Sequence, residues 1–131
     1  MSAIDDAIAA ARSTLDRAEP ADAQRLQREG GLIVDIRPIV NRTEEGEIPG
    51  SVPIERIHLE WRLDPSSEWR LPEVTPDLPV VVVCNEGWAS SLAAADLRRL
   101  GLTNATDLVG GYRAWKAAGL PTQEGGTPAV P

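Results

Sequence analysis

Four consecutive valines at positions 80–83 limit the folds open to this 131-residue chain more than any other feature. β-branched residues favour strands, and a strand without polar alternation is typical of one that is buried on both faces. Such strands occur in parallel sheets that are covered by helices on each side. The run therefore predicts an α/β protein with a central parallel sheet flanked by helices on both faces.

The rest of the chain alternates between helical and strand-like patterns. A second buried strand is expected at 32–36, because this β-branched run follows a glycine pair. Residues 37–50 are polar and are expected to form a loop, and the proline-rich residues 65–79 a connector. The other expected elements are helices over 2–18, from Pro20 to the Gly30-Gly31 pair, 57–64, 89–100 and 112–118, and short strands over 52–54 and 106–109.

The chain has the length of one domain, and no linker or internal repeat divides it. We expect an N-terminal helical extension over residues 1–19 and a main domain over 20–121. The last segment, 122–131, is rich in Gly, Pro and Thr, which predicts a disordered tail.

The composition excludes several classes of protein. One cysteine and one histidine cannot form a disulfide, a CxxC redox pair or a cysteine-rich zinc site, so neither a metal nor a cofactor is expected. A net charge of -7 argues against a nucleic-acid partner, which would need a basic surface. The chain has no apolar run of about 20 residues, which predicts no membrane span. A lone thiol without a secretory signal at the N-terminus predicts a cytoplasmic protein.

That single cysteine, Cys84, lies between the valine strand and the expected helix 89–100. In α/β sheets, ligands bind at the carboxyl ends of the strands, where Cys84 is placed. A short turn containing Gly87 can direct several N–H groups to one point, and the positive end of the helix dipole lies beside it. The context predicts a reactive thiolate above an anion-binding turn, although a buried cysteine at a strand end can also be a small apolar residue.

Four stretches of sequence resemble, in order, the motifs of the rhodanese-like sulfurtransferase family. Residues 34–38 (VDIRP) match the D-x-R signature of the first strand, and residues 46–51 (GEIPGS) resemble G-H-I-P-G-A. Residues 84–90 (CNEGWAS) fit the active-site pattern C-x-x-G-x-x-S. Residues 108–121 (LVGGYRAWKAAGLP) fit the closing L-x-G-G-x-x-x-W…G-x-P.

The resemblance implies a rhodanese-like domain and a sulfurtransferase activity. Cys84 matches the nucleophile that takes sulfane sulfur from a donor and holds it as a persulfide. The donor would be thiosulfate or another small sulfur anion or persulfide, and the acceptor a thiol, a protein thiol being one candidate. The backbone amides that would cradle the persulfide belong to Asn85, Glu86, Gly87, Trp88 and Ala89.

The loop also departs from the family pattern. Many active rhodaneses carry a basic residue where this chain has Ala89, and Glu86 should repel thiosulfate. The family's histidine in G-H-I-P-G is Glu47 here. A rhodanese-like module that binds a partner through an idle Cys84 therefore stays open. A cysteine phosphatase is disfavoured, because its C-x5-R loop needs arginine where this chain has Ser90.

Other polar residues could supply the cation that the loop lacks. We expect Asp35 and Arg37 to form an internal ion pair, whereas the other candidates could bind substrate or be exposed to solvent. Trp88 is expected either to form a wall of the substrate mouth or to anchor a partner protein. The candidate substrate-binding residues are Arg42, His58, Arg62 and Ser90.

Overall fold

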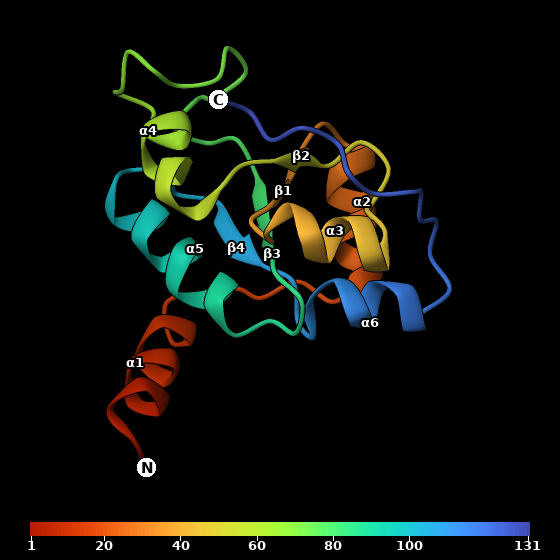
Figure 1. Ribbon diagram of the computed structural model, residues 1–131. Helices are drawn as coiled ribbons and strands as arrows, with labels where there is room; N and C mark the ends of the chain where they lie inside the picture. Colours follow the sequence, from red (N-terminus) through yellow and green to blue (C-terminus); the bar gives the residue numbers. More distant parts are fainter.

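The computed structural model describes residues 1–131 and contains a parallel sheet of four strands in the order β2-β1-β3-β4 (Figure 1). Leu32 pairs with Val80 and Asp35 with Val83, so the two central strands are in register over their whole length. The predicted α/β class is confirmed. The strands are β1 (Leu32–Asp35), β2 (Val52–Pro53), β3 (Val80–Val83) and β4 (Ala105–Asp107).

The valine strand fills both halves of the core, because successive side chains of a strand point to opposite faces of the sheet. Val80 and Val82 belong to one apolar cluster, and Val81 and Val83 belong to the other. All four are buried, as the absence of polar alternation predicted. Both faces of the sheet are therefore covered by core residues, and the carboxyl ends of the strands are the place where a site can lie.

Helices cover both faces of this sheet (Figure 1). The apolar side chains of α4 and α5 pack on one face, and those of α2 and α6 on the other. The first helix, α1, packs on α5. None of the helices is both long and apolar enough to cross a membrane. The helices are α1 (Ala3–Arg12), α2 (Pro20–Arg28), α3 (Ile39–Glu45), the 3-10 turn η1 (Arg56–His58), α4 (Leu59–Leu63), α5 (Ala89–Arg99) and α6 (Gly111–Ala117).

The first helix begins as expected and ends earlier than expected. Ser2 and Asp5 form a capping box at its N-terminus. The helix stops at Arg12 instead of continuing to residue 18, because residues 16–18 run beside the edge strand β4. There the Ala18 N–H donates to the Asp107 carbonyl, and the Val109 N–H donates to the Ala18 carbonyl. These bonds satisfy backbone groups at an otherwise open sheet edge.

The expectation of a loop throughout residues 37–50 is wrong, because this segment contains helix α3. The apolar residues Ile39 and Val40 of this helix are exposed, while its Arg42 is buried. This arrangement reverses the usual amphipathic pattern, so periodicity could not reveal the helix.

Residues 122–131, for which the composition predicts disorder, follow the surface of the domain in the structure. Gln123 forms an antiparallel bridge with Glu47, and the Val130 N–H donates to the Pro53 carbonyl. The Thr127 hydroxyl donates to the Glu47 carboxylate at 2.6 Å. The segment is therefore held both by the buried carboxylate of Glu47 and by Val130, which packs against an apolar core cluster.

Candidate active site

The Cys84 loop, residues 84–90, leaves the carboxyl end of β3 and leads into α5. The side chain of Cys84 is 9% exposed and belongs to the same apolar cluster as Ile36, which follows β1. The Tyr112 N–H donates to the Cys84 carbonyl at 2.8 Å, so the start of α6 also holds the loop. The sheet and two helices therefore fix the position of the thiol.

Three groups contact the sulfur of Cys84. The backbone N–H groups of Gly87 and Ser90 point at Sγ, with nitrogen–sulfur distances of 3.2 and 3.4 Å. The Ser90 Oγ lies 3.3 Å from Sγ and donates its own proton to Asp107. Because a hydroxyl has one proton, Ser90 can only accept from the thiol S–H in this arrangement. The two amides are hydrogen-bond donors directed at this sulfur.

The other amides of the loop are not paired within the chain. The N–H groups of Asn85, Glu86, Trp88 and Ala89 have no hydrogen-bond acceptor within the chain. The tight turn depends on Gly87, whose φ of +86° is strained for other residues. A Cβ at this position would lie only 2.9 Å from the Gly110 nitrogen. Unpaired amides at a helix N-terminus are suited to bind an anion or a persulfide.

A buried carboxylate, Asp107 at the end of β4, organises the rear of the loop. It accepts hydrogen bonds from the hydroxyls of Ser90 and Ser91, each at 2.8 Å. Arg17 completes the cluster with an Nε–Oδ1 distance of 2.8 Å. Sequence reasoning missed Asp107, Ser91 and Arg17. The one available signal was an acidic residue, Asp107, inside the expected strand 106–109.

Arg12 is a second arginine at the rear of the loop that sequence reasoning missed. Its Nη2 donates to the Gly87 carbonyl at 2.7 Å, and its Nε donates to Ser91 Oγ at 3.1 Å. The guanidinium also lies 4.7 Å from the ring centre of Trp88, within the range of a cation–π contact. Burial and the neighbouring Arg17 both lower the pKa of Arg12. An arginine nevertheless keeps its charge at neutral pH.

Glu86 has a cationic neighbour, which the sequence did not indicate. Its carboxylate lies 3.5 Å from Arg113 Nη1, and both side chains are more than half exposed. The guanidinium of Arg113 also donates to Glu45, and this hydrogen bond raises the pKa of Arg113. Part of the repulsion that Glu86 exerts on an incoming anion is therefore offset.

Arg42 is a core ion-pair residue, not the substrate ligand suggested by its polar sequence context. Its Nη1 lies 2.6 Å from Glu47 Oε2, and the two side chains are 2% and 3% exposed. Burial alone would raise the pKa of Glu47, but hydrogen bonds from Thr127 and Arg42 outweigh it and lower the pKa. The guanidinium therefore cannot reach a substrate at Cys84.

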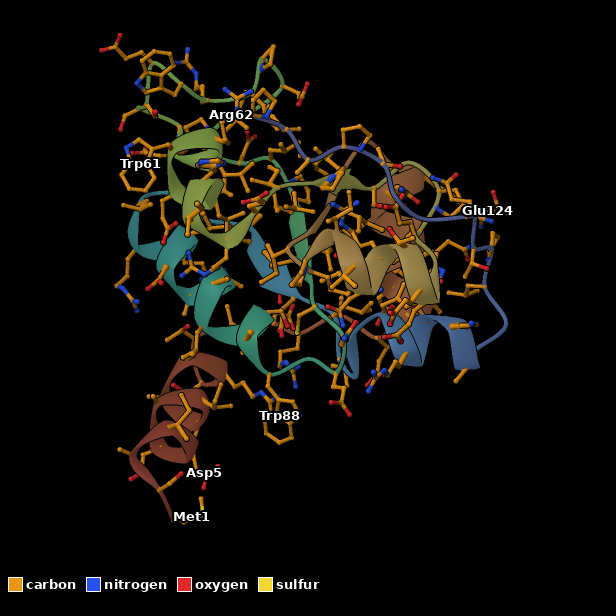
Figure 2. The ribbon with its side chains drawn as sticks, in the orientation of Figure 1. Met1, Asp5, Trp61, Arg62, Trp88 and Glu124 are labelled. Atoms are coloured by element: carbon orange, nitrogen blue, oxygen red, sulfur yellow. The ribbon has the colours of Figure 1, made fainter.

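His58 and Arg62 lie away from the Cys84 loop. With Trp61 and Trp69 they line a separate cavity of about 250 Å³, and Arg62 donates to the Trp69 carbonyl. Figure 2 shows Arg62 and Trp61 at one end of the molecule and Trp88 at the other. Of the four candidate substrate residues, only Ser90 contacts the thiol.

The Asp35–Arg37 pair lies in the wall beside the site. It is fully buried, with an Nη2–Oδ2 distance of 2.7 Å, and Arg37 also stacks on the ring of Tyr112. This matches the internal ion pair that the sequence predicts. A cavity of about 340 Å³ opens beside it at the carboxyl ends of β1 and β2, the sheet edge that also carries Cys84. Its apolar lining comes mainly from Ile36, Ile39 and Ile57.

The fold and the loop define an α/β protein with a cysteine in the turn between β3 and α5, where two backbone N–H groups point at its sulfur. A model of the Rhodanese-like domain matches residues 19–118, and the chain belongs to this family. Thiosulfate sulfurtransferase GlpE of Pseudomonas savastanoi pv. phaseolicola is 33% identical over 101 residues, which cover 77% of this chain and 87% of that protein.

Solved structures show the same fold. A protein of unknown function from Rhodopseudomonas palustris CGA009, called a possible tyrosine phosphatase, is 33% identical with a TM-score of 0.82. The match covers 94% of this chain and 96% of that one. The polysulfide-sulfur transferase homodimer from Wolinella succinogenes is 27% identical with a TM-score of 0.68, covering 88% and 82% of the two chains. The resemblance inferred from four motifs is confirmed.

Proposed function

We propose that this protein is a sulfurtransferase that moves sulfane sulfur through a persulfide on Cys84. The observation that carries the proposal is the geometry around Sγ, where two N–H groups point at the sulfur. The N–H groups of four further loop residues have no hydrogen-bond acceptor within the chain. The similarity to thiosulfate sulfurtransferase GlpE over most of both chains supports the same activity.

The chemistry needs only the thiolate and the amides. With thiosulfate as donor, the Cys84 thiolate attacks the outer sulfur, the sulfur–sulfur bond breaks, and sulfite leaves with the bonding electron pair. The loop amides stabilise the negative charge on the persulfide, as donors do in an oxyanion hole. A thiol acceptor or cyanide then attacks the outer persulfide sulfur and restores the Cys84 thiolate. Because the chain has one cysteine, this acceptor is an external molecule.

The charges around the loop bear on the choice of donor. The nearby guanidiniums are already engaged, Arg12 by the Gly87 carbonyl, Arg17 by Asp107 and Arg113 by Glu45 and Glu86. A dianion such as thiosulfate would therefore depend on backbone amides alone. We include organic persulfides and 3-mercaptopyruvate among the donors, and small or protein thiols among the acceptors. A reduced cytoplasmic thiol fits this cycle.

The phosphatase class that one similar structure carries in its name is not favoured here. Phosphoryl oxygens would need the forked donor of an arginine six residues after the cysteine. In this chain that residue is Ser90, whose hydroxyl is already bonded to Asp107.

Steady-state kinetics with each sulfur donor and cyanide as acceptor test the proposal. We expect parallel double-reciprocal lines, the signature of a two-step exchange through a covalent intermediate. The variant Cys84→Ser should lose turnover, and Arg28→Ala, an exposed change on α2, should keep it. If no sulfane donor supports turnover while Cys84 still reacts with an alkylating reagent, the protein is instead a binding module with an idle cysteine.

A further inference from the structure

The active site extends beyond the residues that match the family. The Rhodanese-like domain model begins at residue 19, yet two side chains at the rear of the Cys84 loop come from residues before it. Arg12 ends helix α1, and Arg17 belongs to the segment that runs along β4. The N-terminal extension therefore contributes directly to the surroundings of the candidate nucleophile.

Both arginines hold the same carbonyl. The Gly87 oxygen accepts from Arg12 Nη2 at 2.7 Å and from Arg17 Nη2 at 3.1 Å. The Ser91 hydroxyl lies 3.4 Å from this oxygen. A carbonyl held by two cations makes charge-assisted hydrogen bonds, which are stronger than neutral ones.

Fixing this carbonyl also fixes the next amide. The chain has no cis peptide bond, so the Trp88 N–H points away from the Gly87 oxygen and from the two arginines. The Trp88 amide is one of the unpaired loop donors, and its neighbours at Gly87 and Ser90 already face Sγ. A rotation of this peptide would remove one donor from the cradle and present a carbonyl oxygen in its place.

We propose that Arg12 and Arg17 are positioning residues for sulfur transfer, holding the Gly87–Trp88 peptide with its N–H toward the persulfide. Arg12 also places a positive charge behind the loop, where Ala89 supplies none, whereas the charge of Arg17 is paired with Asp107. This inference rests on the proposed function. It assigns to the N-terminal extension a role in setting the reactivity of Cys84 rather than in folding alone.

Arg12 permits a cleaner test than Arg17. Removing Arg17 leaves the fully buried Asp107 without its cation, which endangers the fold. Arg12 has only a carbonyl, a hydroxyl and an aromatic ring as partners. A substitution of Arg12 leaves the other charged groups around the Cys84 loop unchanged. These are Asp107 and Arg17 at the rear of the loop, and the exposed Glu86 and Arg113.

The experiment measures alkylation of Cys84 by iodoacetamide across a pH series, together with kcat and KM. We expect Arg12→Met to slow alkylation at neutral pH about three- to tenfold and to move the midpoint of the profile to higher pH. Arg12→Lys, which keeps the charge and can still donate to the Gly87 carbonyl, should recover most of the rate. Arg28→Met is the matched control, because it removes an exposed arginine and should change neither measurement.

The outcomes separate this inference from the proposed function. Unchanged alkylation and unchanged kcat in Arg12→Met would overturn the positioning role, even if the protein transfers sulfur. An alkylation profile that depends on Arg12 would support the role, even if no donor supports turnover. If Arg12→Met does not fold, the same measurements are made on Arg12→Lys and Arg12→Gln. A wild-type pH profile of Cys84 alkylation in both variants would overturn the role.

Discussion

The buried pair between Arg42 and Glu47 gives the sharpest prediction about stability. The carboxylate of Glu47 accepts from Arg42 and from the backbone and hydroxyl of Thr127. The variant Glu47→Ala would leave the guanidinium of Arg42 buried with only carbonyl partners, those of Arg37 and Thr127.

Breaking a buried pair by removing one partner costs about 3–5 kcal/mol. We expect Glu47→Ala to lower the free energy of unfolding by that amount, and Glu47→Gln by roughly half, because an amide keeps some hydrogen bonds. Replacing both partners, as in Arg42→Met with Glu47→Leu, should cost less than Glu47→Ala alone, because no uncompensated charge remains.

Urea unfolding followed by tryptophan fluorescence measures these free energies. Asp22→Ala is the control, because Asp22 and Arg25 form an exposed pair on α2 whose loss should cost less than about 1 kcal/mol. A loss below about 1 kcal/mol for Glu47→Ala would refute the reasoning that this buried pair stabilises the domain.

The same pair predicts a dependence on pH. The pKa of Glu47 is lowered in the folded protein, so its contribution is fully present above the unfolded value of about 4.3. It is lost as the pH falls through the lower folded pKa. Below pH 4.3, wild type should therefore lose free energy of unfolding faster than Glu47→Gln. Equal slopes would contradict the assignment.

Three further predictions concern the loop and the C-terminal segment. Glu86→Lys or Ala89→Arg should lower KM for thiosulfate severalfold by adding a cation at the mouth, and an unchanged KM would show that loop charge does not set donor choice. Gly87→Ala should abolish turnover and lower the free energy of unfolding by about 1–3 kcal/mol, because its φ of +86° is strained for alanine; wild-type kinetics would count against the cradle geometry. Deleting residues 125–131 should destabilise the domain by about 2–4 kcal/mol in thermal and urea unfolding, because Thr127 satisfies the buried Arg42; an unchanged midpoint would return the segment to a free tail.

Short sequence patterns were enough to predict the central strand and the turn that carries Cys84. The run Val80–Val83 carried its own evidence of burial, and Cys84 with Gly87 identified a strand, a turn and a helix in one short stretch. Such features can be read from sequence because strand burial and turn geometry are set by neighbouring residues.

The rear of the site could not be predicted in this way. Arg12 contacts a carbonyl 75 positions further along the chain, and Arg17 meets Asp107 across 90 positions. Composition ranks every arginine alike, and only the fold decides which one faces a buried carboxylate. Arg42 resembled a solvent-exposed loop cation for a different reason: its partner Glu47 lies only five residues away, but the polar local sequence gave no sign that both side chains are buried.

Intact mass spectrometry tests the central claim, a persulfide on Cys84, most directly. The protein is incubated in turn with thiosulfate, 3-mercaptopyruvate and an organic persulfide, then weighed before and after addition of cyanide. We expect a gain of one sulfur atom, about 32 Da, that cyanide removes and that Cys84→Ser never shows. No gain with any donor, while the same sample is fully alkylated at Cys84, would contradict it.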